Sequence, residues 1–178
     1  MLLLIDFVNP LDFPGAQRIS RPAVAAARHT ARLKARLTAR GVQAIYANDN
    51  FGAWRSEFSR LVESCRRRRG PSRQLVELLA PAPSDIAVLK PRHSAFFATP
   101  LAVLLAQLGT RRLIVAGLAA DICVLFTASD AFLRGFELWV PADCVAAESA
   151  ARKRAALNFM ARVLKADTHA SQGRAVRR

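Results

Sequence analysis

The sequence predicts an α/β fold in which a parallel, doubly wound sheet is covered by helices on both faces. Short, almost continuously apolar runs are typical of strands buried on both sides, and segments with the period of amphipathic helices separate them. Right-handed crossovers between parallel strands place such helices in two outer layers. The length of 178 residues is enough for one full core. We therefore expect one domain over residues 1–178, with a polar tail over about residues 166–178 that need not be ordered.

Five apolar runs are the expected strands. In chain order they are Leu2–Ile5, Val42–Ala47, Ile86–Leu89, Leu113–Leu118 and Phe136–Val140. Polar residues follow three of them: Asp6 ends the first, Asn48-Asp49-Asn50 breaks the second, and Lys90 ends the third. Because parallel strands all point the same way, these polar side chains are expected at one edge of the sheet.

Capping residues and helix breakers mark the expected helices. Ser20 is expected to cap a helix with Pro22 in its first turn, and Ser149 to cap the last helix. Thr99 supplies an N-cap hydroxyl and Pro100 the first helical position. The expected helical segments are Ala23–Arg40, about Arg55 to Arg69, Ser72–Leu79, Pro100–Leu108, Cys123 to Gly135, and Ala150–Leu164.

The composition restricts the location and the partners of the protein. The N-terminal apolar run meets Asp6 after four residues, so we do not expect it to be a signal peptide. No apolar stretch approaches the roughly 20 residues of a spanning helix, so no membrane partner is expected. The odd number of cysteines, three, predicts reduced thiols in a cytoplasmic protein. The net charge is +14, but the sequence has no nucleic-acid-binding motif. We therefore expect a solvated arginine-rich surface and not a nucleic-acid site.

Three reactive side chains are expected at the carboxyl edge of the sheet. They are Asp6 after the first strand, Lys90 after the third and Cys123 after the fourth. A thiol near a helix start is expected to be stabilised as thiolate by the helix dipole. Asp6 can take its proton, Lys90 can stabilise the thiolate, and the backbone N–H groups of Ala119 and Cys123 can form an oxyanion hole.

Each of these residues alone also has an ordinary structural explanation. A cysteine is usually a small buried hydrophobe, an aspartate after a strand usually caps a turn, and a lysine there is usually solvated. We expect Cys65 and Cys144 to be inert in that way. The convergence of Asp6, Lys90 and Cys123 on one edge favours catalysis.

The chain also resembles the isochorismatase-like cysteine hydrolase family. The matching stretches are LLLIDFVNP, IYANDNFGAW, VLKPRHSAFFATPL and IVAGLAADICVLFTASDAFLRGFELWVPAD. The resemblance implies a Rossmann-like three-layer α/β/α sandwich with a mainly parallel five- or six-stranded sheet, and a homodimer or homotetramer. It implies that Asp6 is the general base, Lys90 the charged orienter and Cys123 the nucleophile. It further implies a cis peptide at Leu118–Ala119 that shapes the oxyanion hole.

Departures from the family pattern bear on cofactor and substrate. The nicotinamidase branch binds a metal through Asp-x-His and further histidines, whereas this chain has Asp49-Asn50-Phe51 and only His29, His93 and His169. We therefore predict no metal and no cofactor. Ala120 stands where the family usually has a threonine. Members that hydrolyse isochorismate can lack the cysteine, so Cys123 favours hydrolysis of a small carboxamide through a thioester.

Four aromatic residues are expected to wall the pocket for this small-molecule substrate. They are Phe51, Trp54, Phe96 and Phe97, which follow the second and third strands. Phe96 and Phe97 are equally well explained as core or subunit-interface residues. Two other functions stay open: an isochorismate-type vinyl-ether hydrolase, and a binding or assembly module with a vestigial site and a basic surface.

Overall fold

A parallel sheet of six strands forms the centre of the computed structural model, which describes residues 1–54 and 57–172. The strands are β1 (Leu2–Ile5), β2 (Ala44–Asp49), β3 (Ile86–Lys90), β4 (Arg112–Leu118), β5 (Glu137–Trp139) and β6 (Val145–Ala146). Their order is β3-β2-β1-β4-β5, and β6 pairs with the C-terminal end of β4 at Gly117 and Leu118. The expected α/β fold class with a mainly parallel sheet is confirmed.

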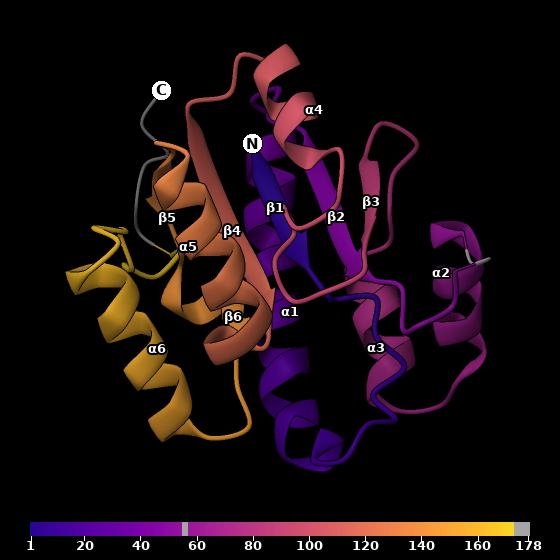
Figure 1. Ribbon diagram of the computed structural model, residues 1–178. Coiled ribbons are helices and arrows are strands. Elements are labelled where there is room, and N and C mark those ends of the chain that lie inside the picture. The colour runs from indigo at the N-terminus through magenta and orange to yellow at the C-terminus, as the bar shows by residue number, and fades with distance from the viewer. Residues whose placement is uncertain (55–56, 173–178) are drawn as a thin grey trace.

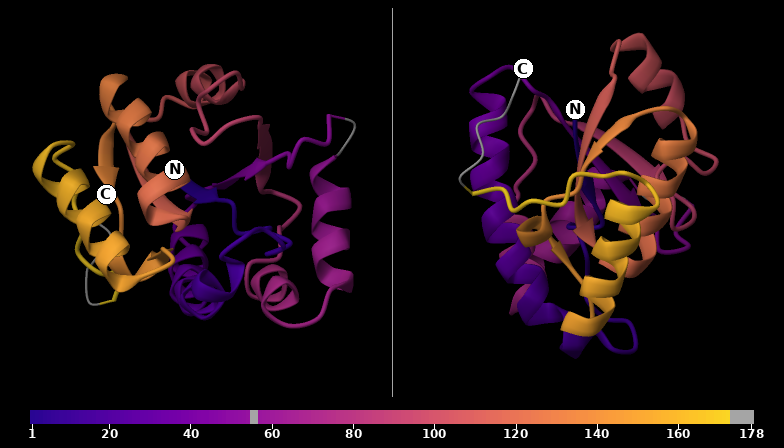
Figure 2. Two further views of the ribbon diagram at one scale, coloured as in Figure 1. Left: turned by 60° about the horizontal axis from the view of Figure 1, so that its bottom comes forward. Right: turned by 90° about the vertical axis from the view of Figure 1, so that its left-hand side faces the viewer.

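Helices cover both faces of this sheet (Figures 1 and 2). One layer consists of α1 (Ala16–Thr38), α2 (Phe58–Arg67) and α3 (Pro71–Leu78). The other consists of α4 (Leu101–Gln107), α5 (Leu125–Leu133) and α6 (Ala150–Arg162). Two short helical turns, η1 (Ala120–Val124) and η2 (Ala142–Cys144), follow β4 and β5. No described helix has the length and apolar character needed to cross a bilayer.

The alternation of side chains along β1 explains its unbroken apolar sequence. Leu2 and Leu4 belong to the core beneath α1 and α3, while Leu3 and Ile5 belong to the core beneath α4, α5 and α6. All four residues are buried. A strand with a core on each face needs apolar residues at every position.

The chain reverses its direction across the sheet between β1 and β4. At this switch point Ile5 lies beside Gly117. Gly117 has a φ of +148°, and a Cβ there would lie 2.2 Å from the Ile5 carbonyl oxygen. Glycine therefore permits the close approach of the two strands. The residues that follow β1 and β4 meet at this point, which is where ligands bind in open α/β sheets.

The first helix begins earlier than the sequence indicated. α1 starts at Ala16 with Gly15 as N-cap, and the Ser20 hydroxyl donates a hydrogen bond to the Ala16 carbonyl instead of capping. Pro22 therefore lies inside the helix. Ala16 and Ile19 are buried in the core, and this apolar contact explains why the helix begins before the proline.

The second strand runs through the polar residues that were expected to end it. β2 continues to Asp49 because the buried Asn48 amide pairs with the backbone of Val8. Its Nδ2 donates to the Val8 carbonyl at 2.5 Å, and the Val8 N–H donates to its Oδ1 at 3.3 Å. This pairing ties the loop after β1 to β2.

Other boundaries differ by a few residues. The sequence missed β6 and did not separate the π-helical turn η1 from α5. The expected helix start near Arg55 lies outside the described residues, and α2 is helical from Phe58. α4 begins at Leu101 with Pro100 as its N-cap, one residue later than expected, although the Thr99 hydroxyl does accept the Leu101 N–H. Ser149 caps α6 as expected, by accepting the Arg152 N–H.

The first part of the expected tail is attached to the sheet. The Val140 N–H donates to the Asp167 carbonyl at 2.7 Å, and Trp139 Nε1 donates to the His169 carbonyl at 3.0 Å. Ser171 is buried and donates its hydroxyl to Asp143 at 2.7 Å. Residues 173–178 lie outside the described part of the chain.

Candidate active site

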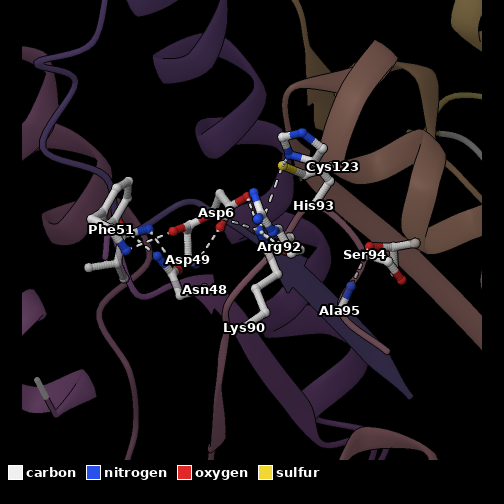
Figure 3. Close-up of polar contacts among 12 residues, drawn as sticks. Asp6, Asn48, Asp49, Phe51, Lys90, Arg92, His93, Ser94, Ala95 and Cys123 are labelled. Carbon is white, nitrogen blue, oxygen red and sulfur yellow. Dashed lines mark hydrogen bonds and ion pairs between the residues drawn. The ribbon is translucent and has the colours of Figure 1, made fainter. Parts of the chain in front are cut away.

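The structure brings together the three reactive residues that the sequence singled out (Figure 3). Asp6 follows β1, Lys90 is the last residue of β3, and Cys123 lies in η1. Lys90 Nζ is 2.9 Å from Asp6 Oδ2 and 3.6 Å from Cys123 Sγ. The charge of the Asp6 carboxylate also acts on the thiol and raises its pKa. The three functional groups therefore form one connected cluster.

Lys90 is a fully buried cation that is surrounded by acceptors. Its Nζ lies 3.6 Å from Asp49 Oδ2 and donates to the Arg92 carbonyl at 3.2 Å, in addition to its pair with Asp6. Burial disfavours the ammonium, but the nearby Asp6, Cys123 and Asp49 outweigh it and raise the pKa of Lys90. Lys90 thus carries its charge at neutral pH.

Asp6 is held in an unusual backbone conformation. Its φ is 51°, in the left-handed region that non-glycine residues rarely occupy. The Asp49 N–H donates to its Oδ1 at 2.7 Å, and the side chain is almost completely buried. Burial raises the pKa of Asp6, while Lys90 and the Asp49 N–H oppose this rise. The carboxylate is consequently a better proton acceptor than an ordinary aspartate.

The surroundings of the Cys123 thiol favour its protonated form, whereas the sequence favoured the thiolate. Burial and the neighbouring Asp6 charge raise the pKa of Cys123 to about 12, although Lys90 lowers it. Cys123 also lies in the π-helical turn η1, before α5 begins at Leu125. Any stabilisation of the thiolate by the helix dipole is therefore weaker than the effects of burial and of the Asp6 charge. A base must remove the proton when the sulfur attacks.

The expected cis peptide between Leu118 and Ala119 is confirmed. Ala119 and Cys123 both line the same cavity. Cys123 lies in η1, where the N–H groups of Ile122 and Val124, on either side of it, both donate to the Ala119 carbonyl. The oxyanion hole expected from the N–H groups of Ala119 and Cys123 stays a prediction.

A cavity of about 330 Å³ opens above the cluster. Its lining residues are Asp6, Asn9, Phe13, Ile19, Asp49, Phe51, His93, Leu118, Ala119, Ile122, Cys123, Glu148 and Arg152. Of the four aromatic residues expected to wall it, only Phe51 does so. Trp54 is 80% exposed and Phe97 is 58% exposed, both outside the lining. Phe96 is a core residue beside Phe136, which is the alternative that the sequence left open.

Several cavity residues were not singled out as site residues from the sequence. His93 Nδ1 lies 3.7 Å from Cys123 Sγ, and its position three residues after Lys90 was a usable signal. Arg152 comes from α6 and forms ion pairs with Asp121 and Glu148 at the cavity wall. The local sequence does not indicate that Arg152 belongs to the site, because only the tertiary fold brings α6 to this edge of the sheet.

The structure places the chain's histidines apart from one another. His29 contacts Asp143 and His169 contacts Asp167, whereas His93 lies at Cys123. Within residues 1–54 and 57–172, no group of three or more His, Cys, Asp or Glu side chains is arranged to hold a metal ion. Metal independence stays a prediction from the residue types.

Comparisons with known proteins agree with this geometry. A family model described as "Isochorismatase domain" matches residues 1–171. The uncharacterized isochorismatase family protein YaaI of Bacillus subtilis (strain 168) is 34% identical, over 93% of this chain and 91% of its own length. Ureidoacrylate amidohydrolase RutB of Enterobacter sp. (strain 638) is 51% identical over 59 residues, which is 33% of this chain and 26% of RutB. An isochorismatase family protein from Desulfovibrio vulgaris has a similar structure, with a TM-score of 0.77 and 26% identity over 96% of this chain and 93% of that one.

Proposed function

This chain belongs to the isochorismatase family of hydrolases, and we propose that it is a metal-independent cysteine amidase acting on a small carboxamide. The observation that carries the proposal is the cluster at the base of the cavity. Lys90 Nζ lies 2.9 Å from Asp6 Oδ2 and 3.6 Å from Cys123 Sγ there, and the charge of Asp6 acts on the thiol. This arrangement pairs a nucleophile with a base and a fixed cation.

The first half-reaction forms a thioester. Asp6 takes the thiol proton as Cys123 Sγ attacks the carbonyl carbon of the amide. The N–H groups of Ala119 and Cys123 stabilise the oxyanion of the tetrahedral intermediate. Asp6 then gives its proton to the leaving nitrogen, the C–N bond breaks, and the acyl group stays on the sulfur. The raised pKa of Asp6 supports both transfers, because the same group must accept and return a proton.

Lys90 supports this cycle without transferring a proton. Its ammonium is ion-paired with Asp6 and lies 3.6 Å from Cys123 Sγ, so it can offset the negative charge of whichever group is ionised. Because it is buried and holds further contacts to Asp49 and the Arg92 carbonyl, its position is fixed. Water then hydrolyses the thioester and restores the thiol.

The cavity indicates the size and polarity of the substrate. Phe13, Ile19 and Leu118 give it apolar walls, and its volume of about 330 Å³ suits a small acyl group. RutB, whose name describes a ureidoacrylate amidohydrolase, has a segment of 51% identity with this chain, which supports amide chemistry. The presence of Cys123 also favours amide over vinyl-ether hydrolysis.

A panel of small carboxamides, assayed for ammonia release, tests the proposal. The wild-type protein should release ammonia from at least one of them, and Cys123→Ala should not. Activity that survives in Cys123→Ala but disappears in Asp6→Asn would indicate acid-catalysed ether-type chemistry instead. Salt-sensitive nucleic-acid binding that survives Cys123→Ala, together with no hydrolysis, would indicate a binding module.

A further inference from the structure

His93 lies on the open side of the nucleophile. Its Nδ1 is 3.7 Å from Cys123 Sγ, its side chain lines the cavity, and the residue is exposed to solvent. Asp6, whose charge acts on the same thiol, is only 4% exposed. Figure 3 shows the imidazole beside the sulfur. The sulfur thus has one buried and one solvent-facing acid–base neighbour.

The contacts around His93 fix its position. The preceding carbonyl, that of Arg92, accepts a hydrogen bond from Lys90. The following residue, Ser94, donates its hydroxyl to Asp130 of α5. The imidazole ring packs on Phe126 with the ring centres 5.5 Å apart. His93 is therefore held between β3 and α5, as a preorganised catalytic group is.

Hydrolysis of a thioester needs a base that water can reach. Asp6 also lines the cavity, but it is only 4% exposed, and once it has given its proton to the leaving nitrogen its carboxylate is again paired with Lys90 and accepts the Asp49 N–H. A water molecule enters from the open side of the cavity, where the imidazole of His93 is the neighbour of the sulfur. A neutral imidazole with a free ring nitrogen accepts a proton from such a water molecule.

We propose that His93 is a further catalytic residue, the base for hydrolysis of the Cys123 thioester; this inference rests on the proposed function. His93 Nδ1 accepts a proton from water as the water oxygen attacks the thioester carbonyl carbon. The C–S bond then breaks, and the sulfur receives that proton from the imidazolium. The products are a carboxylic acid and the free thiol, and His93 returns to its neutral form.

An ester probe separates the two half-reactions. The 4-nitrophenyl acetate leaving group departs as an anion without needing a proton, so the initial burst of nitrophenolate reports acylation and the steady rate reports hydrolysis of the acetyl thioester. In His93→Phe, which keeps an aromatic ring beside Phe126, we expect the burst to remain. The steady rate should fall about 100-fold, and acetyl-Cys123 should accumulate in the intact-mass spectrum. His169→Phe, which changes an exposed histidine outside the cavity, should behave as wild type.

Chemical rescue distinguishes catalysis from a structural role. In His93→Ala, added imidazole should speed the loss of the acetyl group from Cys123, as measured by mass. An unchanged steady rate in His93→Phe, or an equal fall of burst and steady rate, would overturn the role of His93. A wild-type protein that reacts without acetylation of Cys123 would overturn the proposed function and this role with it. A wild-type adduct on Cys123 combined with fast hydrolysis in His93→Phe would overturn the role of His93 alone.

Discussion

Two cysteines in this protein have similar neighbours, yet their surroundings differ in the properties that chemistry requires. Burial raises the pKa of both Cys123 and Cys144 to about 12. Each thiol has an aspartate beside it, Asp6 for Cys123 and Asp143 for Cys144. Cys144 even has a lysine, Lys153, within electrostatic range. Residue types and thiol pKa therefore do not distinguish the two regions.

Access to the thiol and the pKa of the neighbouring aspartate do distinguish Cys123 from Cys144. Cys144 has no exposed surface and packs in the core beneath α1, whereas Cys123 lines a cavity. Burial opposes the charge of Asp143, but hydrogen bonds from the N–H and hydroxyl of Ser171 hold the pKa of Asp143 below its usual value. Asp143 is thus a poor base whose lone pairs are occupied. A reactive cysteine here needs an open cavity and a carboxylate that can take a proton.

Replacing each cysteine by alanine should give the largest difference in activity between the two regions. Cys123→Ala should lower the rate of amide hydrolysis by at least about 1,000-fold, because the nucleophile is lost. Cys144→Ala should stay within about twofold of wild type and lose about 1 kcal/mol of stability through a small cavity. Ammonia release and urea unfolding measure the two effects. Similar losses of rate in both variants would contradict the distinction.

Replacing each aspartate by asparagine distinguishes the base, Asp6, from the structural hydrogen-bond acceptor, Asp143. Asp6→Asn should abolish turnover, yet it should lower the pKa of Cys123, because the negative charge that raises it disappears while Lys90 remains. The ultraviolet absorbance of the thiolate, followed against pH, measures this shift. Asp143→Asn should leave turnover unchanged. A Cys123 pKa that stays the same or rises in Asp6→Asn would show that Asp6 does not act on the thiol.

Replacing each lysine tests the two charge environments. The pKa of Lys90 is raised in the fold, so its charge stabilises the protein below the ordinary lysine value of 10.5. Lys90→Met should therefore cost roughly 3–5 kcal/mol at neutral pH, because Asp6 is left as an unpaired buried charge. Burial lowers the pKa of Lys153, so Lys153→Met should be neutral or slightly stabilising. Equal destabilisation of both variants in urea would contradict this account.

The smallest expected effect is the pH dependence contributed by Asp143. Its pKa is lowered in the fold, so its stabilisation is present above the ordinary value of 3.8 and is lost as the pH falls through the folded value. Wild type should be more stable than Asp143→Asn at neutral pH. The difference should shrink as the pH falls below 3.8. Urea unfolding at several pH values measures it, and a constant difference would assign the effect to packing.

The sequence was sufficient to predict that Asp6, Lys90 and Cys123 would meet. Each follows or ends an apolar strand, and parallel strands deliver their carboxyl ends to one edge. The environments of the side chains could not be predicted as well from the sequence. The sequence favoured a thiolate at Cys123, whereas burial and a neighbouring carboxylate raise the pKa of this thiol in the fold. These are tertiary effects that no local pattern encodes.

The pocket walls show the same limit. Phe51 lines the cavity, but Phe96 turns into the core beneath α5. Both residues follow strands, so the sequence could not tell which face each side chain would take. Arg152 reaches the cavity only because α6 packs against η1. Contacts between segments far apart in sequence decide the lining, whereas the order of strands decides the nucleophile and its base.

The most direct test of the proposed chemistry is to trap the acyl group on the enzyme. Wild-type protein should be mixed with a carboxamide that it hydrolyses, quenched in acid within one turnover, and digested for peptide mass spectrometry. The proposal predicts an acyl group on the peptide that carries Cys123 and none on those that carry Cys65 or Cys144. Turnover of the same carboxamide with no acyl group on Cys123, and with full activity in Cys123→Ala, would contradict it.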